Sequence, residues 1–519
     1  MAESRVKKSL LNAKVNLIFY MLTLALSFFS RKIFLNCLGA DFVGLIGTMQ
    51  NLLGFLNLAE LGVGAAIGYV LYKPLFEEDH RQINEIISVF GYLYRWIGWI
   101  ILALGSILAC FLPLIFPNTG FELGVIYAAY FAFLSSSLIG YFINYKQTLL
   151  GADQKNYVVT AYFQSTNIVK ILIQMASAWY TGSYYLWVAI ELVFGVICSF
   201  ILNWRIRVTY PWLKSEVQQG IELFKKYPEV IKYTKQLFVQ KASYIVQYQT
   251  IPFLIYTFVN LKYVAFYGNY TIITDKLSQF LNTFFESTGA SVGNLIAEGN
   301  TTKIKKLFWE LLSIRYLIGS TITFMVYVMI EPFINLWLGS EYLLPKSILF
   351  LICINILIGY TRGSVMQFLF GYGMFSDVWA PVTEIILNLG IAVVAGYFWG
   401  LNGILLGSIA SQLSIIGIWK PYFLFSKAFR ESVWGYWKKL SAYLFSITVT
   451  WLVVVELVNP NIPIQPALSL FHWMLYAILE FAAFSFTCFL LMFLLTQGMK
   501  DFTFRFIKKR FGEFLLHNK

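Results

Sequence analysis

Long apolar runs recur along the whole chain and indicate its fold class. Each is close to the roughly 20 residues that an α-helix needs to cross a hydrocarbon core about 30 Å thick. Runs such as 97–112 and 440–458 are apolar on every face, whereas a strand of a membrane β-barrel alternates apolar and polar residues. About fourteen runs lie between residues 15 and 496. The pattern predicts an all-α polytopic membrane protein with about 14 transmembrane helices.

Composition agrees with this fold class. Hydrophobic residues make up 58% of the chain, charged residues only 13%, and the mean hydropathy is +0.67. A soluble globular domain carries about 25% charged residues, so this class is excluded. The five cysteines are widely separated and fall mostly within apolar runs. We therefore expect neither a disulfide framework nor a metal cluster.

Basic residues lie mainly on one side of the predicted spans. The basic segments are 205–235, 303–306, 420–439 and 500–519, all on the side of the N-terminus. Connections on the opposite side, such as 113–121 and 459–466, are short and nearly free of lysine and arginine. Because basic connections remain in the cytoplasm, both termini are predicted to be cytoplasmic.

An internal duplication has an offset of about 220 to 225 residues. The matched pairs are 64–68 with 289–293, 149–151 with 369–371, and Arg95 with Arg315. Copies that share one orientation predict two pseudo-symmetric six-helix lobes related by an axis along the membrane normal. The predicted domains are an N-terminal lobe at 1–204, a cytoplasmic linker at 205–235, a C-terminal lobe at 236–425, and two extra spans with a basic tail at 426–519.

Polar side chains at helical spacing occur in the first two spans of each predicted lobe. The clearest case is span eight, with Asp275, Gln279, Asn282 and Glu286 on one face and Lys276 on the adjoining stripe. The other stripes contain Arg31 and Lys32 in span one, Asn57 and Glu60 in span two, and Gln240, Lys241 and Gln247 in span seven. Such stripes can be contacts between helices. Because a charged group at the bilayer centre costs roughly 2.5 to 3.5 kcal/mol, the charged stripes favour a water-filled cavity.

The charges of these stripes indicate the cargo. The predicted anion-binding residues of the cavity are Arg31, Lys32, Lys241 and Lys276. Glu60, Asp275 and Glu286 are candidate carriers of a coupling proton or cation, and the amides are further polar cavity candidates. An alternative for Arg31 and Lys32 is that they extend to the outer interface.

Charged residues in other spans have structural interpretations. Lys170 marks either a second, lateral site or an ion pair with Glu191. Arg95 and Arg315 are interpreted as a duplicated structural pair. No glycine-rich phosphate loop, Asp-x-Asp pair or cluster of cysteine or histidine occurs in the sequence. The chain is therefore predicted to be no enzyme, to hold no cofactor or metal, and to use a gradient of H⁺ or Na⁺.

Three strings resemble a known family. Arg31 followed by 38–39 (Leu-Gly) and 44–45 (Gly-Leu) resembles the opening motif of the polysaccharide-repeat flippases, which belong to the multidrug/oligosaccharidyl-lipid/polysaccharide exporter superfamily. Residues 57–64 and 149–154 resemble later motifs of that family. The resemblance covers about residues 1–425.

This resemblance implies a central cavity lined by spans one, two, seven and eight. It implies a flippase in the bacterial inner membrane that moves an undecaprenyl-diphosphate-linked oligosaccharide from the cytoplasmic to the outer leaflet by alternating access. Expected partners are that glycan and the bilayer, with a polysaccharide polymerase and glycosyltransferases as further candidates and no nucleic acid.

Three alternative functions are retained. The first is a lipid II flippase, because the two extra spans resemble those of fourteen-span relatives. The second is a drug/cation antiporter, for which a predominantly acidic cavity would be expected. The third, of a different class, is a polytopic polysaccharide polymerase or ligase, which would carry a large outer loop; the longest outer connection here is about a dozen residues.

Overall fold

The computed structural model describes residues 5–56, 63–117, 119–153, 155–227, 249–286, 292, 295–296, 298–374 and 376–517. Over these ranges the elements are helices, without a strand, and ten of the helices are long and apolar enough to cross a membrane. This confirms the predicted all-α polytopic class. The total of about fourteen spans stays a prediction. Two further helices, α6 (Asn156–Thr181) and α10 (Leu261–Glu286), have 26 residues each and are not among those ten.

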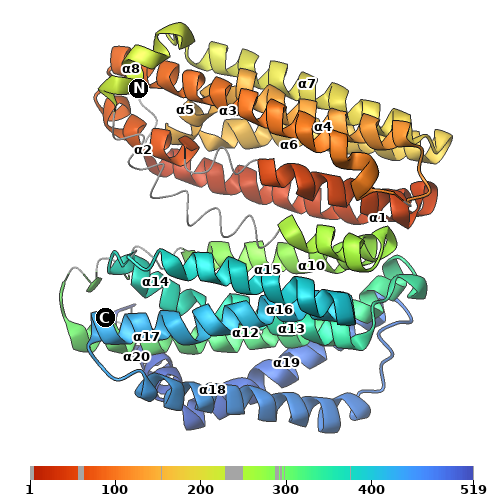
Figure 1. Cartoon of the computed structure of the whole chain (residues 1–519). Helices are drawn as coiled ribbons and strands as arrows, with labels where there is room; N and C mark the ends of the chain where they lie inside the picture. The colour runs from red at the N-terminus through yellow and green to blue at the C-terminus, as the bar shows by residue number, and fades with distance from the viewer. Residues whose placement is uncertain are drawn as a thin grey trace. The chain divides into compact units, whose positions relative to one another are not determined.

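The chain divides into two compact units, Met1–Ala265 and Phe266–Lys519, which are described separately (Figure 1). The division falls within α10, and the predicted domain boundaries stay predictions. Besides α6, the first unit contains α1 (Arg5–Leu56), α2 (Val63–Phe76), α3 (His80–Ile115), α4 (Leu123–Ile143), α5 (Gln147–Ala152), α7 (Tyr184–Thr209) and α8 (Gly220–Lys226).

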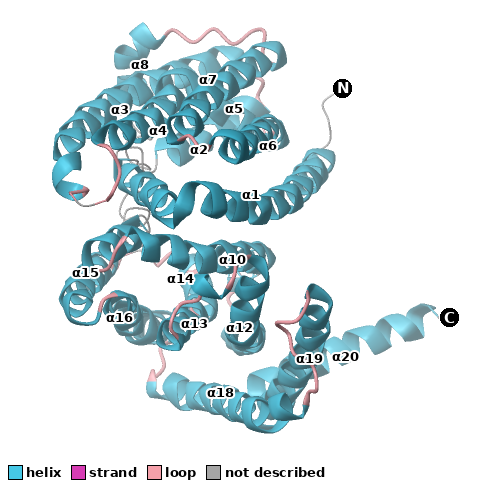
Figure 2. Cartoon of the chain, turned by 90° about the vertical axis from the view of Figure 1, so that its right-hand side faces the viewer, coloured by secondary structure: helices cyan, strands magenta, loops and turns pink. Residues whose placement is uncertain are grey.

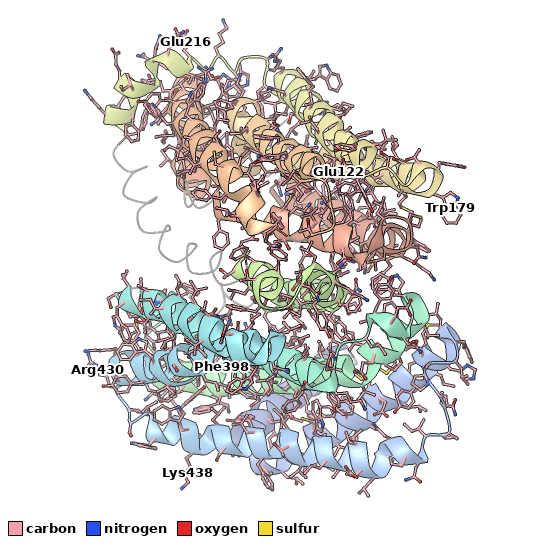
Figure 3. All side chains as sticks on the ribbon, turned by 45° about the vertical axis from the view of Figure 1, so that its right-hand side comes forward. Glu122, Trp179, Glu216, Phe398, Arg430 and Lys438 are labelled. Atoms are coloured by element: carbon pink, nitrogen blue, oxygen red, sulfur yellow. The ribbon has the colours of Figure 1, made fainter. Side chains whose placement is uncertain are left out.

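Helix α1 bends at Gly39, where the backbone has φ 83° and ψ 160°. A positive φ is strained for residues with a Cβ, so glycine suits this position. The bend divides α1 into two helical parts at the predicted outer end of span one. Within the unit, α1 packs against α6, α6 against α7, α7 against α4, and α4 against α3. Trp179, near the end of α6, lies on the surface of this bundle (Figure 3).

The predicted cytoplasmic linker is described as far as Tyr227 and is folded onto α3. Glu85 of α3 accepts hydrogen bonds from Lys226 Nζ at 2.6 Å and from the Tyr227 hydroxyl at 2.7 Å. A Cβ on Gly220 would lie 3.0 Å from the carbonyl oxygen of Ser88. This part of the linker is therefore an ordered element of the first unit.

Helix α12 (Thr301–Trp337) is central to the second unit. The other helices are α13 (Lys346–Thr361), α14 (Gly363–Gly371), α15 (Trp379–Trp399), α16 (Leu401–Gln412), α17 (Lys420–Leu424), α18 (Trp434–Val453), α19 (Leu470–Leu495) and α20 (Gln497–His517). Helix α12 packs against α13, α19 and α20. The rings of Phe324 and Phe484 stack with centroids 4.3 Å apart, and the hydroxyls of Ser313 and Tyr443 are hydrogen-bonded at 2.7 Å. The two extra spans, α18 and α19, thus belong to the core of this unit.

Each unit contains an aspartate in the loop before a helix: Asp153 before α6 and Asp377 before α15. Each aspartate bonds to a residue that lies in or next to another helix. In the first unit, Asp153 accepts a hydrogen bond from the Tyr210 hydroxyl at 2.8 Å and pairs with Lys155 at 2.7 Å. Burial, and then the charge of Asp153, raise the pKa of Tyr210 above its usual range, so this hydroxyl keeps its proton. In the second unit, Asp377 pairs with Lys420 at 2.7 Å and accepts from Trp419 Nε1 at 3.0 Å.

Asp153 lies two residues after the string 149–151, and Asp377 lies six residues after the copy of that string at 369–371. The two carboxylates therefore follow the same duplicated string at different distances, and their donors differ. The aromatic donor Tyr210 directly follows the sixth span of the first lobe, and Trp419 lies within the corresponding span of the second lobe. We interpret the two clusters as ties that join neighbouring spans within each unit.

Replacing Asp377 with asparagine is expected to destabilise the protein more than the same change at Asp153. The side chains of Asp377 and Lys420 are only 6% and 10% exposed. Removing one partner of a buried ion pair costs about 3–5 kcal/mol of unfolding free energy, whereas a partly exposed pair contributes about 1 kcal/mol or less. Thermal unfolding of both variants in the same detergent measures the difference. Equal losses would contradict this ranking.

Candidate functional site

Several predicted site residues have side chains outside the described part of the chain: Asn57, Glu60, Gln240, Lys241, Gln247 and Glu286. The backbone of Glu286 is described as the last residue of α10. The remaining predicted residues lie on two helices, α1 and α10.

Helix α10 exposes a polar face. Asp275, Gln279 and Asn282 follow at i, i+4 and i+7, and all three side chains are exposed. Lys276, on the adjoining stripe, is half-buried. A carboxylate and two amides thus lie in one line on the exposed side of this helix. This face therefore presents groups that can bind a polar molecule.

The opposite face of α10 is packed against the second unit. Leu281 and Phe285 are buried with Tyr360 of α13, beside isoleucines of α12. The hydroxyls of Ser278 and Tyr360 are hydrogen-bonded at 3.1 Å. Near the other end of the helix, the buried Tyr270 hydroxyl accepts from the backbone N–H of Leu344 at 3.0 Å. These contacts fix the rotation of α10 and thereby the direction of its polar face.

Arg315 of α12 supports the end of α10. Its side chain is 7% exposed, and its guanidinium carbon lies 4.1 Å from the centroid of the Phe285 ring. Arg315 Nη2 also donates to Gln367 Oε1 at 3.2 Å. A desolvated cation over an aromatic ring contributes about 2 kcal/mol. Its duplicated counterpart, Arg95, is exposed, so the two arginines differ in burial, and their interpretation as a duplicated structural pair stays a prediction.

Replacing Gly363 with alanine is expected to displace Arg315 and destabilise the protein by about 1–3 kcal/mol. A Cβ on Gly363 would lie 2.6 Å from Arg315 Cζ, a distance that forces the guanidinium to move. Gly359, one turn earlier on the same span, is the matched control, because a Cβ there would meet nothing within 4 Å. Thermal unfolding should show a loss for Gly363→Ala only; similar behaviour of the two variants would contradict the packing argument.

Arg31 lies in the first helical part of α1 and is half-buried. Its Nη2 donates to the carbonyl oxygen of Ala265, in the first turns of α10, at 2.7 Å. The second part of α1 also approaches α10 closely, since a Cβ on Gly44 would lie 2.8 Å from the carbonyl carbon of Leu261. Arg31 is therefore directed at a neighbouring helix, whereas Lys32 is exposed, which agrees with the alternative that Lys32 extends to the interface.

Lys170 forms an ion pair with Glu191, one of the two alternatives that the sequence predicted. Its Nζ lies 2.7 Å from Glu191 Oε1, and Gln174 Nε2 donates to Glu191 Oε2 at 3.0 Å. The ammonium, the carboxylate and the amide therefore satisfy one another between α6 and α7. This arrangement favours the ion pair over a second, lateral cargo site.

The two helical units define a class: a polytopic helical membrane protein with the fold of known transporters. An inward-facing multidrug resistance MATE family transporter of the MOP superfamily aligns with a TM-score of 0.61 and 14% identity, over 80% of this chain and 98% of that one. The lipid II flippase MurJ, in an inward closed conformation, aligns with a TM-score of 0.65 and 14% identity, over 92% of this chain and 98% of that one. These likenesses show the fold.

Among curated proteins, one from Yersinia pseudotuberculosis that is named as an O-antigen export protein is 22% identical over 445 residues, 80% of this chain and 94% of that protein. No protein-family model matches the chain. The curated relative and the structural neighbours together support the predicted resemblance to a polysaccharide flippase family of the MOP superfamily. None of these three relatives is named as an enzyme, which agrees with the predicted transport role.

Proposed function

We propose that the protein is a flippase that moves an undecaprenyl-diphosphate-linked oligosaccharide, the repeat unit of a surface polysaccharide, from the cytoplasmic to the outer leaflet of the bacterial inner membrane. The observation that carries the proposal is the exposed polar face of α10, with Asp275, Gln279 and Asn282 in line and Lys276 beside them. A glycan needs polar partners in place of water while it crosses the bilayer, and this face supplies them.

The basic residues of the site would bind the diphosphate of the carrier lipid. Arg31 offers a planar guanidinium, which binds phosphate oxygens in pairs, and Lys276 offers a compact ammonium. Lys32 and Lys241 remain candidates for the same role from the sequence. The amides of Gln279 and Asn282, with those of Asn57, Gln240 and Gln247, would bond to sugar hydroxyls.

Coupling to an ion gradient would use the carboxylates of the site. Asp275 is exposed directly before Lys276 on α10, so uptake of H⁺ or Na⁺ there would change the local charge beside the ammonium. Glu60 and Glu286 are further candidates. In this proposal the change in charge weakens or strengthens binding of the anionic cargo, which links ion movement to alternating access.

Two features of the relatives guide the choice of cargo. The similarity to a protein named for O-antigen export supports a polysaccharide repeat unit. The alignment with the lipid II flippase extends over 92% of this chain, which makes lipid II a second candidate cargo. A drug/cation antiporter is less well supported, because Arg31 and Lys276 would repel a cation. We further propose that a polysaccharide polymerase and glycosyltransferases act beside this protein, on the outer and cytoplasmic sides respectively.

Deletion of the gene in its host tests the proposal. We expect surface polysaccharide to be lost and lipid-linked repeat units to accumulate in the inner membrane. Expression of the gene from a plasmid should return both quantities to the wild-type level. Rescue of cells depleted of their lipid II flippase would identify lipid II as the cargo instead. Unchanged polysaccharide together with increased sensitivity to cationic drugs would contradict the flippase proposal and indicate an antiporter.

A further inference from the structure

A glutamate lies in the buried stripe of α19. The buried residues of this helix recur every four positions and are Tyr476, Glu480, Phe484, Cys488 and Met492. Glu480 is 0% exposed and is the eleventh residue of the helix, so it lies inside the span and not at its end. Figure 2 shows α18 and α19 at one edge of the second unit, with α12 between them and α10. The Glu480 carboxyl therefore lies outside the candidate site on α10.

A hydrogen-bond donor to Glu480 comes from the end of α18. This helix continues into the π-helical segment η7 (Val454–Val458), and the backbone N–H of Asn459 donates to the Val454 carbonyl oxygen. In the orientation of the Asn459 amide that satisfies its neighbours, Nδ2 lies 2.6 Å from Glu480 Oε1, 3.0 Å from Oε2 and 2.9 Å from the Val454 carbonyl oxygen. Short π-helical turns next to α-helices occur frequently at functional sites. Here the π-helical turn is followed by an amide that is directed at a buried carboxyl.

The groups that face Glu480 are neutral. Besides the Asn459 amide, its hydrogen-bonding partner is the Tyr476 hydroxyl, one turn earlier on α19. Among the residues that the structure describes, no lysine, arginine or histidine pairs with Glu480. Glu456 of η7 is exposed, and α12 contributes the Phe324 ring, which stacks on α19 one turn away. Because a buried carboxylate without a cation is strongly disfavoured, this carboxyl needs a bound positive charge.

The hydrogen bonds around Glu480 favour a proton over a metal cation. In the neutral carboxyl group, one oxygen accepts from Asn459 Nδ2, and the O–H can donate to the Tyr476 hydroxyl oxygen, because a phenol both donates and accepts. A metal cation would require the amide oxygen of Asn459 to face the carboxyl in place of the amide nitrogen. The amide would then lose its hydrogen bonds to both Glu480 and Val454. The positive charge that fits this site is therefore H⁺.

We propose that Glu480 is a proton-binding site in the two extra spans, separate from the site on α10. The carboxyl holds its proton while the end of α18 is packed against α19. Release breaks the carboxyl O–H bond and transfers the proton to water, and the carboxylate that remains needs hydration, which favours separation of Asn459 from α19. Asn459 is followed by the exposed residues Pro460 and Asn461, which lie in a connection on the predicted outer side. This inference is independent of the proposed cargo.

Infrared difference spectroscopy of the full-length protein in nanodiscs tests the proposal. The wild type and Glu480→Gln are compared at about pH 7, where an exposed glutamate, with an ordinary pKa of about 4.3, is ionised. We expect the wild-type spectrum minus that of the variant to contain the C=O stretching band of one protonated carboxyl group, which moves to lower frequency in D₂O. Carboxylate bands in its place would overturn the proposal. Carboxylate bands that change when Na⁺ is added would overturn it too and indicate a metal-cation site.

Two further variants assign the band to Glu480. Glu456→Gln makes the same chemical change at the exposed glutamate of η7 and should keep the band of the protonated carboxyl. Asn459→Ala leaves the glutamate in place but removes a donor to it, so the band should remain and move to higher frequency. This shift provides the test even if Glu480→Gln fails to fold. A band that is lost in Glu456→Gln, or that is unchanged in Asn459→Ala, would overturn the assignment.

Discussion

Lys276→Glu is expected to abolish surface polysaccharide while the protein remains inserted in the membrane. Lys276 is half-buried on α10, next to Asp275 and beside the exposed polar face. The reversal removes a cation assigned to the diphosphate and places two adjacent carboxylates where an anion should bind. Loss of a charge-assisted contact with added repulsion predicts a fall in transport of at least about 100-fold. The measurement is surface polymer per unit of membrane-inserted protein.

Two variants of the same helix serve as controls for Lys276. Lys262→Glu makes the same change in charge at an exposed position near the start of α10, and it should retain most of the transport. Lys276→Arg keeps the cation and should retain part of it. Wild-type polymer levels in Lys276→Glu would show that this residue does not bind the cargo.

Arg31→Glu is expected to have an effect of similar size in the first unit. The substitution removes the bond from Arg31 Nη2 to the Ala265 carbonyl oxygen and reverses the charge at the predicted diphosphate site. Arg31→Lys keeps the charge but not the planar, paired donors, so intermediate transport is expected. Surface polymer and protein level are again measured together.

Lys14→Glu is the matched control for Arg31, because Lys14 is exposed near the beginning of the same helix. It should leave transport near the wild-type level. If Arg31→Glu and Lys276→Glu both supported wild-type amounts of polymer, the cationic cavity would be ruled out as the cargo site, whatever the fold.

The fold class could be predicted from the sequence because apolar runs of span length have one common structural solution in a bilayer. The pairing of Lys170 with Glu191 was also accessible, since a charge within a span needs a nearby partner and the sequence offers few. The amphipathic pattern of Asp275, Gln279 and Asn282 likewise depends only on helical spacing, and the structure shows these three side chains exposed on one face.

Contacts between helices that are distant in sequence could not be predicted in the same way. The position of Arg315 beneath Phe285 depends on Gly363, which makes room for the guanidinium, and on Gln367, which accepts from it. No local pattern links these residues. Arg95 occupies the matching place in the first copy yet is exposed, because burial depends on the helices that pack around a residue as well as on its own helix.

The paired carboxylates show a signal that sequence reasoning missed. Asp153 and Asp377 follow the duplicated strings 149–151 and 369–371 by two and by six residues, so they are not at the same register position. Their donors, the Tyr210 hydroxyl and the Trp419 ring N–H, differ in residue type. A search for identical strings therefore overlooks the pair, whereas a search for equivalent hydrogen-bonding roles would have found it.

Reconstitution into proteoliposomes tests the central claim most directly. A defined undecaprenyl-diphosphate-linked oligosaccharide is placed in both leaflets, and its movement is followed by the access of an external enzyme that modifies the glycan. We predict that the purified protein brings the initially protected glycan to the outside faster than it appears in protein-free vesicles, and that Lys276→Glu removes this acceleration. Equal movement with and without the wild-type protein, under an imposed H⁺ or Na⁺ gradient, would contradict the assignment as a flippase of lipid-linked oligosaccharides.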